Sequence, residues 1–347
     1  MTARMKFDGA LLTSDLAQVP ALARELATAG YDGAFSFEGP HEPFLPLLLA
    51  AEHAPSLEIS TGLAIALARN PMVVANLAYD LHAYAQGRFI LGLGSQIRPH
   101  IERRYSSTWE RPLARMREFV LALKAIFACW NDGDTLDFRG EFYTHTLMPP
   151  LFHPGPNPHG RPPIMLGAVG AKATEIAAEV ADAMLVHPFH SVASLKTITL
   201  PAVERGLQRA GRAPSDFFLA CQSLVVTGAD DNEIDAARAA TRSQIAFYAS
   251  TPSYRVVLDA EGWGELQPEL QAMTRRGQWA EMTAAITDAM LERFAVVGSP
   301  EQVGELLCQR YGAMARRIAF ASPYPVSSDC ARRIFSAYRA AAQRGHA

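Results

Sequence analysis

The sequence predicts an α/β fold, and within that class a (β/α)8 TIM barrel. Short apolar runs alternate with longer amphipathic segments along the whole chain, as in parallel strands joined by crossover helices. The chain has 347 residues, a length that barrels with insertions reach as one unit. We therefore expect a single domain over residues 1–347, with insertions at about 131–163 and 250–293.

The expected strands are the eight short apolar runs, and the expected helices lie between them. The strands are predicted at residues 7–12, 33–37, 58–65, 88–94, 164–168, 183–187, 217–226 and 317–321. Apolar residues recur at spacings of three and four in the segments 16–29, 71–85, 113–129, 172–181 and 234–249, which predicts helices there. Asn70 before Pro71 is typical of a helix start, and Ser299 with Gln302 forms a capping-box pattern.

Three segments interrupt this alternation. Residues 135–146 alternate polar and bulky side chains around Arg139-Gly140, which predicts a β-hairpin. Residues 149–163 are rich in proline and predict a surface connector without helix or central strand. Residues 253–292 are long and helical, and such insertions in barrels often cap an active site.

The composition excludes several classes of function. The net charge of -3 gives no basic footprint for nucleic acid or an anionic membrane. The four cysteines lie far apart without a CxxC pair, which argues against disulfides and a zinc ribbon and fits a reducing cytoplasm. No HxH or HExxH pattern predicts a metal, and no apolar run predicts a signal peptide or a membrane span. We expect a soluble, cytoplasmic protein with a small-molecule partner.

Functional residues of a barrel lie just after the carboxyl ends of its strands. Glu38 and His41 follow the second expected strand, and His41 could exchange a proton beside a hydride-transfer centre. Alternatively, His41 caps the next helix. Gly62 within the third strand indicates a bulge or a close approach by another group, or else packing under a helix.

The ends of the fourth to sixth strands supply further candidates. Gly92 and Gly94 would let the main chain pass close to a planar ring, with Ser95 and Gln96 bonding its polar edge. The charged residues from Arg98 to Arg104 have a solvated loop as their simplest interpretation. After the fifth strand, small residues open directly into a helix, which predicts a phosphate site or an ordinary tight turn; they are Gly167, Ala168, Val169, Gly170 and Ala171. His187 is expected on the rim, near the polar tail of a cofactor.

Taken together, these residues resemble the luciferase-like monooxygenase superfamily, in particular its F420-dependent oxidoreductases. The resemblance covers nearly the whole chain and rests on Glu38 with residues 41–44, residues 60–63 with 69–71, and residues 87–94, 102–103, 167–171 and 294–301. It implies a cofactor across the strand ends and a non-proline cis peptide at Gly62-Leu63 against the ring. It also implies that His41 lies near the reactive carbon, that Ser95 and Gln96 lie near the pyrimidine edge, and that the amides of residues 167–170 bind the phosphate.

The same resemblance favours F420 over FMN, because flavin-using members tend to have serine or threonine hydroxyls in the phosphate turn. The chain would then transfer a hydride to or from a small organic substrate. Apolar residues around the expected mouth indicate a fairly hydrophobic substrate; they are Phe44, Leu45, Phe189, Tyr254 and Trp263. The alternatives are an FMN-dependent monooxygenase and a catalytically silent binding barrel. A homodimer is expected because dimers are common in such families.

Overall fold

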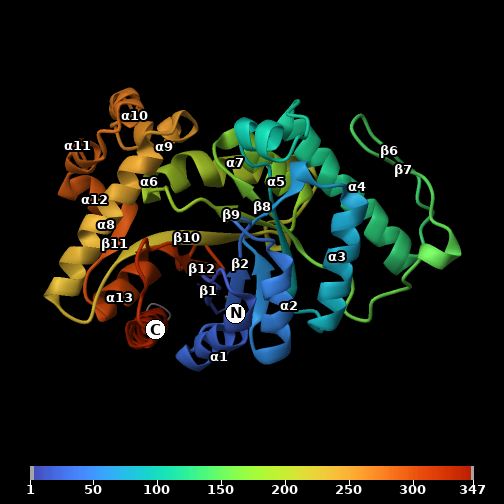
Figure 1. Ribbon diagram of the computed structural model, residues 1–347, viewed down its shortest axis with the longest axis horizontal. Helices are drawn as coiled ribbons and strands as arrows, with labels where there is room; N and C mark the ends of the chain where they lie inside the picture. Colours follow the sequence, from blue (N-terminus) through green and yellow to red (C-terminus); the bar gives the residue numbers. More distant parts are fainter. Residues whose placement is uncertain (1–3, 345–347) are drawn as a thin grey trace.

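A computed structural model, which describes residues 4–344, shows parallel strands closed into a barrel with helices around it (Figure 1). The strand order runs β12-β1-β2-β3-β5-β8-β9-β10, and pairing of β10 with β12 closes the ring. The barrel strands are β1 (Lys6–Ala10), β2 (Gly33–Ser36), β3 (Glu58–Thr61), β5 (Phe89–Gly94), β8 (Ile164–Ala168), β9 (Ala183–Val186), β10 (Phe218–Val226) and β12 (Arg317–Phe320). The predicted barrel is confirmed, and apart from the third strand the strand ends agree with the prediction to within two residues.

Two short strands refine this prediction. The expected third strand is divided into β3 and β4 (Ala64–Ile65) by Gly62 and Leu63, and β4 pairs with the end of β5. A further strand, β11 (Ala295–Val297), was not among the eight expected strands and extends the sheet beside the second half of β10. The second half of β10 is free to pair with β11 because β9 and β12 pair with earlier residues of β10.

Helices cover the outside of the barrel. They are α1 (Val19–Ala29), α2 (Phe44–His53), α3 (Pro71–Tyr84), α4 (Pro112–Asp132), α5 (Ala171–Val180), α6 (Val192–Ser194), α7 (Leu200–Arg209), α8 (Asp231–Ala249), α13 (Pro300–Tyr311) and α14 (Ser328–Arg344). Both predicted caps are confirmed: the Asn70 side chain accepts the Met72 amide at 2.9 Å, and Ser299 and Gln302 bond each other reciprocally. Within residues 4–344, no helix combines the length and apolar character that crossing a membrane requires.

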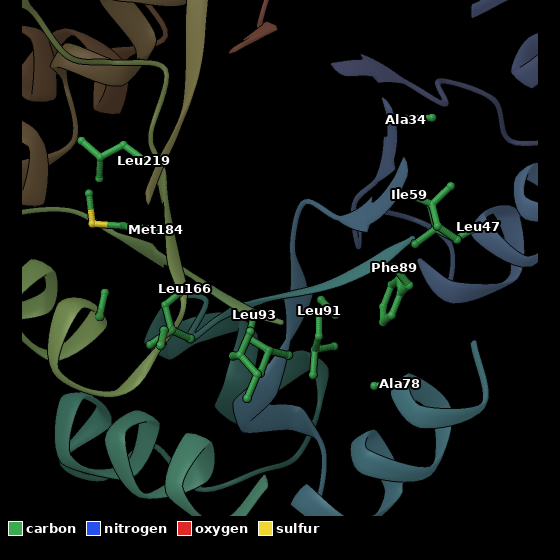
Figure 2. Packing of buried hydrophobic residues seen from close by; sticks show 14 of the residues in the cluster. Ala34, Leu47, Ile59, Ala78, Phe89, Leu91, Leu93, Leu166, Met184 and Leu219 are labelled. Carbon is green, nitrogen blue, oxygen red and sulfur yellow. The ribbon is translucent and has the colours of Figure 1, made fainter. Parts of the chain in front are cut away.

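The strands bury both of their faces, and alternate residues serve the two sides. Phe89, Leu91 and Leu93 of β5 belong to the main core between strands and helices (Figure 2), whereas Ile90 belongs to a smaller cluster inside the barrel. On β8, Leu166 faces the main core and its neighbour Met165 the interior. This period of two follows from the pleat of a strand.

The predicted excursions are present. Strands β6 (Phe138–Arg139) and β7 (Thr144–His145) form the antiparallel hairpin, and the proline-rich connector contains one 3₁₀ turn, Pro150–Phe152. The long segment before β11 contains α9 (Arg255–Asp259), α10 (Leu266–Arg276), α11 (Trp279–Ala284) and α12 (Asp288–Phe294). This helical segment and the hairpin lie at opposite ends of the long axis (Figure 1).

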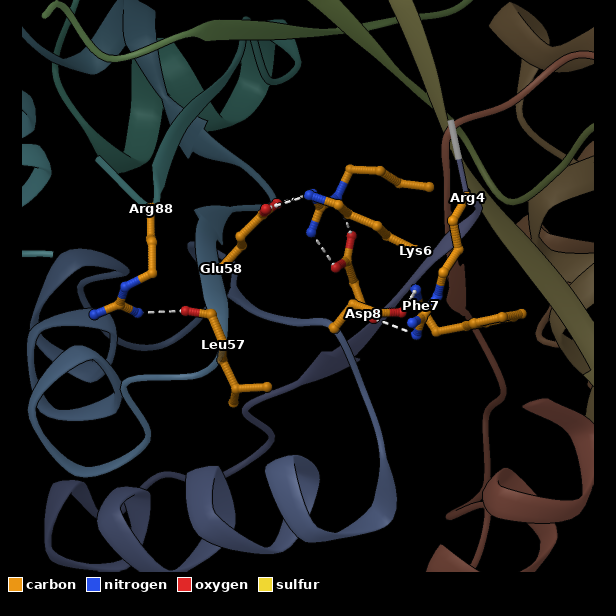
Figure 3. Close-up of polar contacts among 9 residues, drawn as sticks. Arg4, Lys6, Phe7, Asp8, Leu57, Glu58 and Arg88 are labelled. Carbon is orange, nitrogen blue, oxygen red and sulfur yellow. Dashed lines mark hydrogen bonds and ion pairs between the residues drawn. The ribbon is translucent and has the colours of Figure 1, made fainter. Parts of the chain in front are cut away.

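Ion pairs fill the amino-terminal end of the barrel. Arg317 at the start of β12 bonds Asp8 and Glu58, and Lys6 bonds the other oxygen of Glu58. Lys6, Asp8 and Glu58 are labelled in Figure 3. Burial alone would raise the pKa of Glu58, but the nearby charges of Arg317 and Lys6 outweigh burial and hold this pKa below its ordinary value. A Cβ atom on Gly33 would lie 2.5 Å from the Arg317 guanidinium. Glycine at this position therefore makes room for the arginine.

Candidate active site

A cleft of about 740 Å³ opens at the carboxyl ends of the strands, within the range of roughly 300–1,000 Å³ usual for small-molecule sites. At its inner end the cleft shares Gly62, Leu185 and Gln222 with a small enclosed cavity in the barrel, so this end lies on the barrel axis. Its outer end runs between the first turns of α4 and α5, along Leu113, Met116, Ala173 and Ile176. One cleft thus joins the barrel axis to the rim.

The floor of the cleft is the bulge between β3 and β4. The peptide bond between Gly62 and Leu63 is cis, which confirms the prediction, and both residues line the cleft. The Gly62 amide donates to the Ser36 carbonyl at 2.7 Å, and the Leu63 carbonyl accepts the Glu38 amide at 2.9 Å. Backbone bonds to the end of β2 and the residues after it therefore hold the bulge in place.

Glycines of neighbouring strands make room for the bulge. A Cβ atom on Gly92 would lie 1.8 Å from the Thr61 carbonyl oxygen, and one on Gly167 would lie 2.2 Å from the Leu63 side chain. Leu63 is also 3.0 Å from the Cβ position of Gly94. This corrects the interpretation of Gly92, because Thr61 takes the space beside it. Gly94 lines the cleft next to Leu63, so the close approach of a ring to its main chain stays a prediction.

Glu38 positions this bulge and does not line the cleft. Its side chain is 6% exposed and is bonded by Arg69. Its carboxylate also accepts the Ile65 amide and the Tyr105 hydroxyl, both at 2.7 Å. Together with the bond from its own amide to Leu63, these contacts tie Glu38 to both sides of the bulge. The structure therefore supports a positioning role for Glu38 and gives no support to proton transfer by it.

His41 is exposed on the loop between β2 and α2 and is not among the residues that line the cleft. The alternative that His41 caps the next helix is wrong, because the Glu42 carboxylate accepts the first amides of α2, at 2.6 Å from Phe44 and 3.1 Å from Leu45. The predicted catalytic pair, Glu38 and His41, is thus not brought together at the cleft.

The predicted phosphate turn forms part of the cleft wall. Gly167, Ala168 and Val169 line it, and Gly170 precedes α5 with φ of +77° and open space at its Cβ position. Ala171 is the first residue of α5, and no side chain caps this helix. The amides of its first turn therefore have no partner within the helix and can donate hydrogen bonds to an anion.

The loop after β5 supplies the polar part of the wall. Ser95 and Gln96 line the cleft as predicted. Arg98 lines it too, although the sequence interpretation placed it in a solvated loop, and its Nε donates to Glu102 at 2.9 Å. Arg98 could have been identified as a cleft residue from its position, because it lies two residues after Gln96 and close to the end of β5.

His187 and Tyr254 form a hydrogen-bonded pair in the wall. The Tyr254 hydroxyl oxygen lies 3.0 Å from His187 Nε2, and both residues line the cleft. Burial, with a smaller contribution from His190, lowers the pKa of His187 to about 3, and burial raises the pKa of Tyr254 to about 12. Both groups are therefore uncharged near neutral pH.

Tyr254 is the one predicted mouth residue that lines this cleft. Phe44 and Phe189 are buried in the core, and Leu45 is half exposed on α2. Trp263 packs against Phe294, with ring centroids 5.8 Å apart. The apolar character of the wall instead comes from residues that the sequence interpretation did not single out, namely Trp109, Pro112, Leu113, Met116 and Ile176.

Comparison with known proteins relates this chain to enzymes. The family described as luciferase-like monooxygenase matches residues 2–317. The chain is 50% identical over 315 residues to an uncharacterized protein of Mycobacterium tuberculosis, over 91% of this chain and 92% of that one. It is 28% identical over 261 residues to the 5,10-methylenetetrahydromethanopterin reductase of Archaeoglobus fulgidus, over 73% of each chain. The solved coenzyme F420 dependent tetrahydromethanopterin reductase of Methanopyrus kandleri superposes with a TM-score of 0.78 at 19% identity, over 96% of this chain and 97% of that one.

Proposed function

This chain belongs to the luciferase-like monooxygenase family, and on that premise we propose that it is an F420-dependent oxidoreductase acting on a small, hydrophobic organic substrate. One observation carries the choice of cofactor: the anion-accepting turn before α5 is built from glycine, alanine and valine, without a hydroxyl side chain. The reductase from Archaeoglobus fulgidus, related by sequence, and the F420-dependent reductase of the same fold support this choice.

The residues of the cleft fit such a cofactor. Gly62 and Leu63 would support one face of the ring system, and Ser95 and Gln96 would bond its polar edge. The free amides of the first turn of α5 would bind the phosphate, with the positive charge of Arg98 in the same wall. When bound, a deazaflavin supplies hydride chemistry, and the protein supplies orientation and electrostatics.

The walls of the cleft favour an apolar substrate. Among the described residues that line it, Arg98 is the one charged side chain, and we assign its charge to the cofactor phosphate. A sugar phosphate would need further cations at the reacting end, whereas a ketone, enone or imine with apolar substituents would not. We therefore expect turnover on such compounds, and activity confined to sugar phosphates would contradict the substrate class.

The test of the cofactor is a titration of the protein with F420 and, separately, with FMN, followed by absorbance and fluorescence. We expect the F420 spectrum to shift. Ala173→Asp adds a carboxylate to the third residue of α5, where an acid suits the helix but repels a phosphate. It should weaken F420 binding at least about tenfold, a loss of about 1.4 kcal/mol, whereas the matched neutral variant Ala173→Asn should bind nearly as well.

The structure also shows why Ala173→Asp is a better test of the phosphate site than Gly170→Asp. Gly170 has φ of +77° and ψ of 161°, a conformation that is essentially restricted to glycine. Any side chain there strains the backbone, so weaker binding by Gly170→Asp would not isolate the effect of charge.

An FMN-dependent monooxygenase is the second candidate, and the monooxygenase family to which the chain belongs favours it. Oxygen consumption with reduced FMN, together with a shift of the FMN spectrum on binding, would establish it. If neither cofactor binds, the catalytically silent barrel is the better account. His41 keeps a predicted catalytic role from the family resemblance alone, and an unaltered turnover of His41→Ala would remove it.

We further propose that the protein is a homodimer that associates through α2 and α3. These helices expose large apolar side chains on neighbouring turns, with exposed fractions of 42% for Leu48, 55% for Val73 and 41% for Leu77. Covering such a patch is favourable by roughly 25 cal/mol per Å². Leu77→Glu should give monomers in sedimentation velocity, whereas Trp279→Glu, at a tryptophan that is 53% exposed on α11 on the opposite side of the molecule (Figure 1), should not.

A further inference from the structure

Tyr254 reaches the cleft from the segment that follows α8. It ends the 3₁₀ turn Pro252–Tyr254, and its ring lies over His187 just beyond β9, with centroids 4.4 Å apart and ring planes 32° from each other. Gln222 of the neighbouring strand β10 lines the cleft beside them and also borders the cavity inside the barrel. The Tyr254 hydroxyl is thus held in the wall that leads to the barrel axis.

The direction of the bond between Tyr254 and His187 follows from a third residue. The Phe189 amide donates to His187 Nδ1 at 3.1 Å, so this nitrogen carries no proton. A neutral imidazole then carries its proton on Nε2, which donates to the Tyr254 oxygen at 3.0 Å. The hydroxyl hydrogen of Tyr254 is left over, and none of the hydrogen bonds found within residues 4–344 uses it.

The other polar groups of the cleft are less suited to give up a proton. The Ser95 hydroxyl already donates to the Gln96 carbonyl at 3.1 Å, and Arg98 donates to Glu102. Ser253 is exposed to solvent. No aspartate, glutamate, cysteine or lysine is found among the described residues that line the cleft. Tyr254 is therefore the hydroxyl that is both oriented by a partner and free to donate.

We propose that the Tyr254 hydroxyl binds the carbonyl oxygen of a ketone substrate and protonates it during reduction, with His187 as its positioning residue. This inference rests on the proposed function and names the substrate class. When bound, a reduced deazaflavin would supply the hydride for the carbonyl carbon and would thereby be oxidised by two electrons. The electron pair of the C=O π bond moves to the oxygen, which takes the Tyr254 proton and gives a secondary alcohol. His187 Nε2–H stabilises the phenolate that remains until water returns the proton.

Infrared difference spectroscopy of bound cyclohexanone tests the contact without turnover. A hydrogen bond from Tyr254 lowers the carbonyl stretching frequency, so Tyr254→Phe should shift the band to higher wavenumber or lose it. Tyr248→Phe is the matched control, because it removes a hydroxyl from the adjacent ring, 6.2 Å away between centroids, that does not line the cleft. This control should keep the wild-type band. A band that is unchanged in Tyr254→Phe, or no bound ketone in the wild type, overturns the proposal.

The turnover rates of variants distinguish proton donation by the Tyr254 hydroxyl from a packing role of its ring. Tyr254→Phe should lower kcat for ketone reduction by about 10²-fold or more, with the dissociation constant for F420 within twofold of the wild type. His187→Gln keeps an acceptor for Phe189 and a donor for Tyr254 and should retain more kcat than His187→Leu, which keeps neither. Equal rates for all three variants and the wild type would refute the role. If F420 does not bind at all, the proposed function fails, while the infrared band still reports on Tyr254.

Discussion

The two ends of the barrel differ in whether the protein itself satisfies their polar groups. At the amino-terminal end, the charges of Arg317 and Asp8 are buried, and Arg317 bonds both Asp8 and the partly exposed Glu58. At the carboxyl end, Tyr254 and His187 are neutral, and the amides that begin α5 have no partner within their helix. Buried charge is costly unless it is paired, so the amino-terminal end depends on keeping its charged partners together. The carboxyl end instead offers hydrogen-bond donors that a charged ligand can use.

The largest expected effect comes from breaking the paired end. Arg317→Ala leaves Asp8 and Glu58 without their shared partner, which should cost about 3–5 kcal/mol of unfolding free energy, measured by urea unfolding. Arg4→Ala removes an ion pair to Asp32 whose arginine is 62% exposed and should cost at most about 1 kcal/mol. Equal losses for the two variants would contradict the comparison, as would loss of F420 binding by Arg317→Ala without loss of stability.

A smaller effect is expected from crowding the bulge at the open end. Gly92→Ala places its Cβ atom 1.8 Å from the Thr61 carbonyl, which is backbone and cannot turn aside. We expect a loss of about 1–3 kcal/mol and at least tenfold weaker F420 binding, measured by unfolding and by titration. Gly94→Ala meets the end of the Leu63 side chain at 3.0 Å, which can move, and should be less destabilising. If Gly92→Ala leaves the affinity for F420 unchanged, the bulge does not contribute to cofactor binding.

A third effect separates the two ends by pH. Folded His187 stays neutral down to a pKa of about 3 and His190 to about 4, whereas their ordinary pKa is 6.5. Below pH 6.5 the unfolded chain therefore takes up protons that the folded chain does not, and stability falls with pH from 6.5 toward 4. The folded pKa of Glu58 is lowered from its ordinary value of 4.5. The stability that Glu58 contributes is therefore lost only as the pH falls below about 4.5.

Melting temperature as a function of pH measures this difference. In His187→Gln the decline between pH 6.5 and 4 should be shallower than in the wild type, because one buried histidine no longer titrates. The decline below pH 4.5 should remain, since Glu58 and Arg317 are unchanged. An identical profile for the variant and the wild type would show that His187 is not held neutral by the fold.

Local patterns in the sequence were enough for the architecture. Short apolar runs such as residues 88–94, and the spacing of three and four in the segments between them, predicted the strands and helices of the barrel, and both helix caps were confirmed. The family resemblance placed the cis peptide at Gly62-Leu63. It also located the wall residues from Ser95 to Gln96 and from Gly167 to Val169, because these lie at or just after the carboxyl ends of β5 and β8, where a barrel binds its ligands.

The roles of individual side chains were decided by the tertiary structure. Glu38 occurs in the expected motif, yet Arg69 and Tyr105 orient its carboxylate onto the bulge. Tyr254 is 67 positions from His187, and only the return of the chain after α8 brings the two together. The sequence by itself determined the fold, because hydrophobic periodicity is a local property of the chain. It could not determine which polar groups face the cleft, because that depends on which distant residue satisfies each of them first.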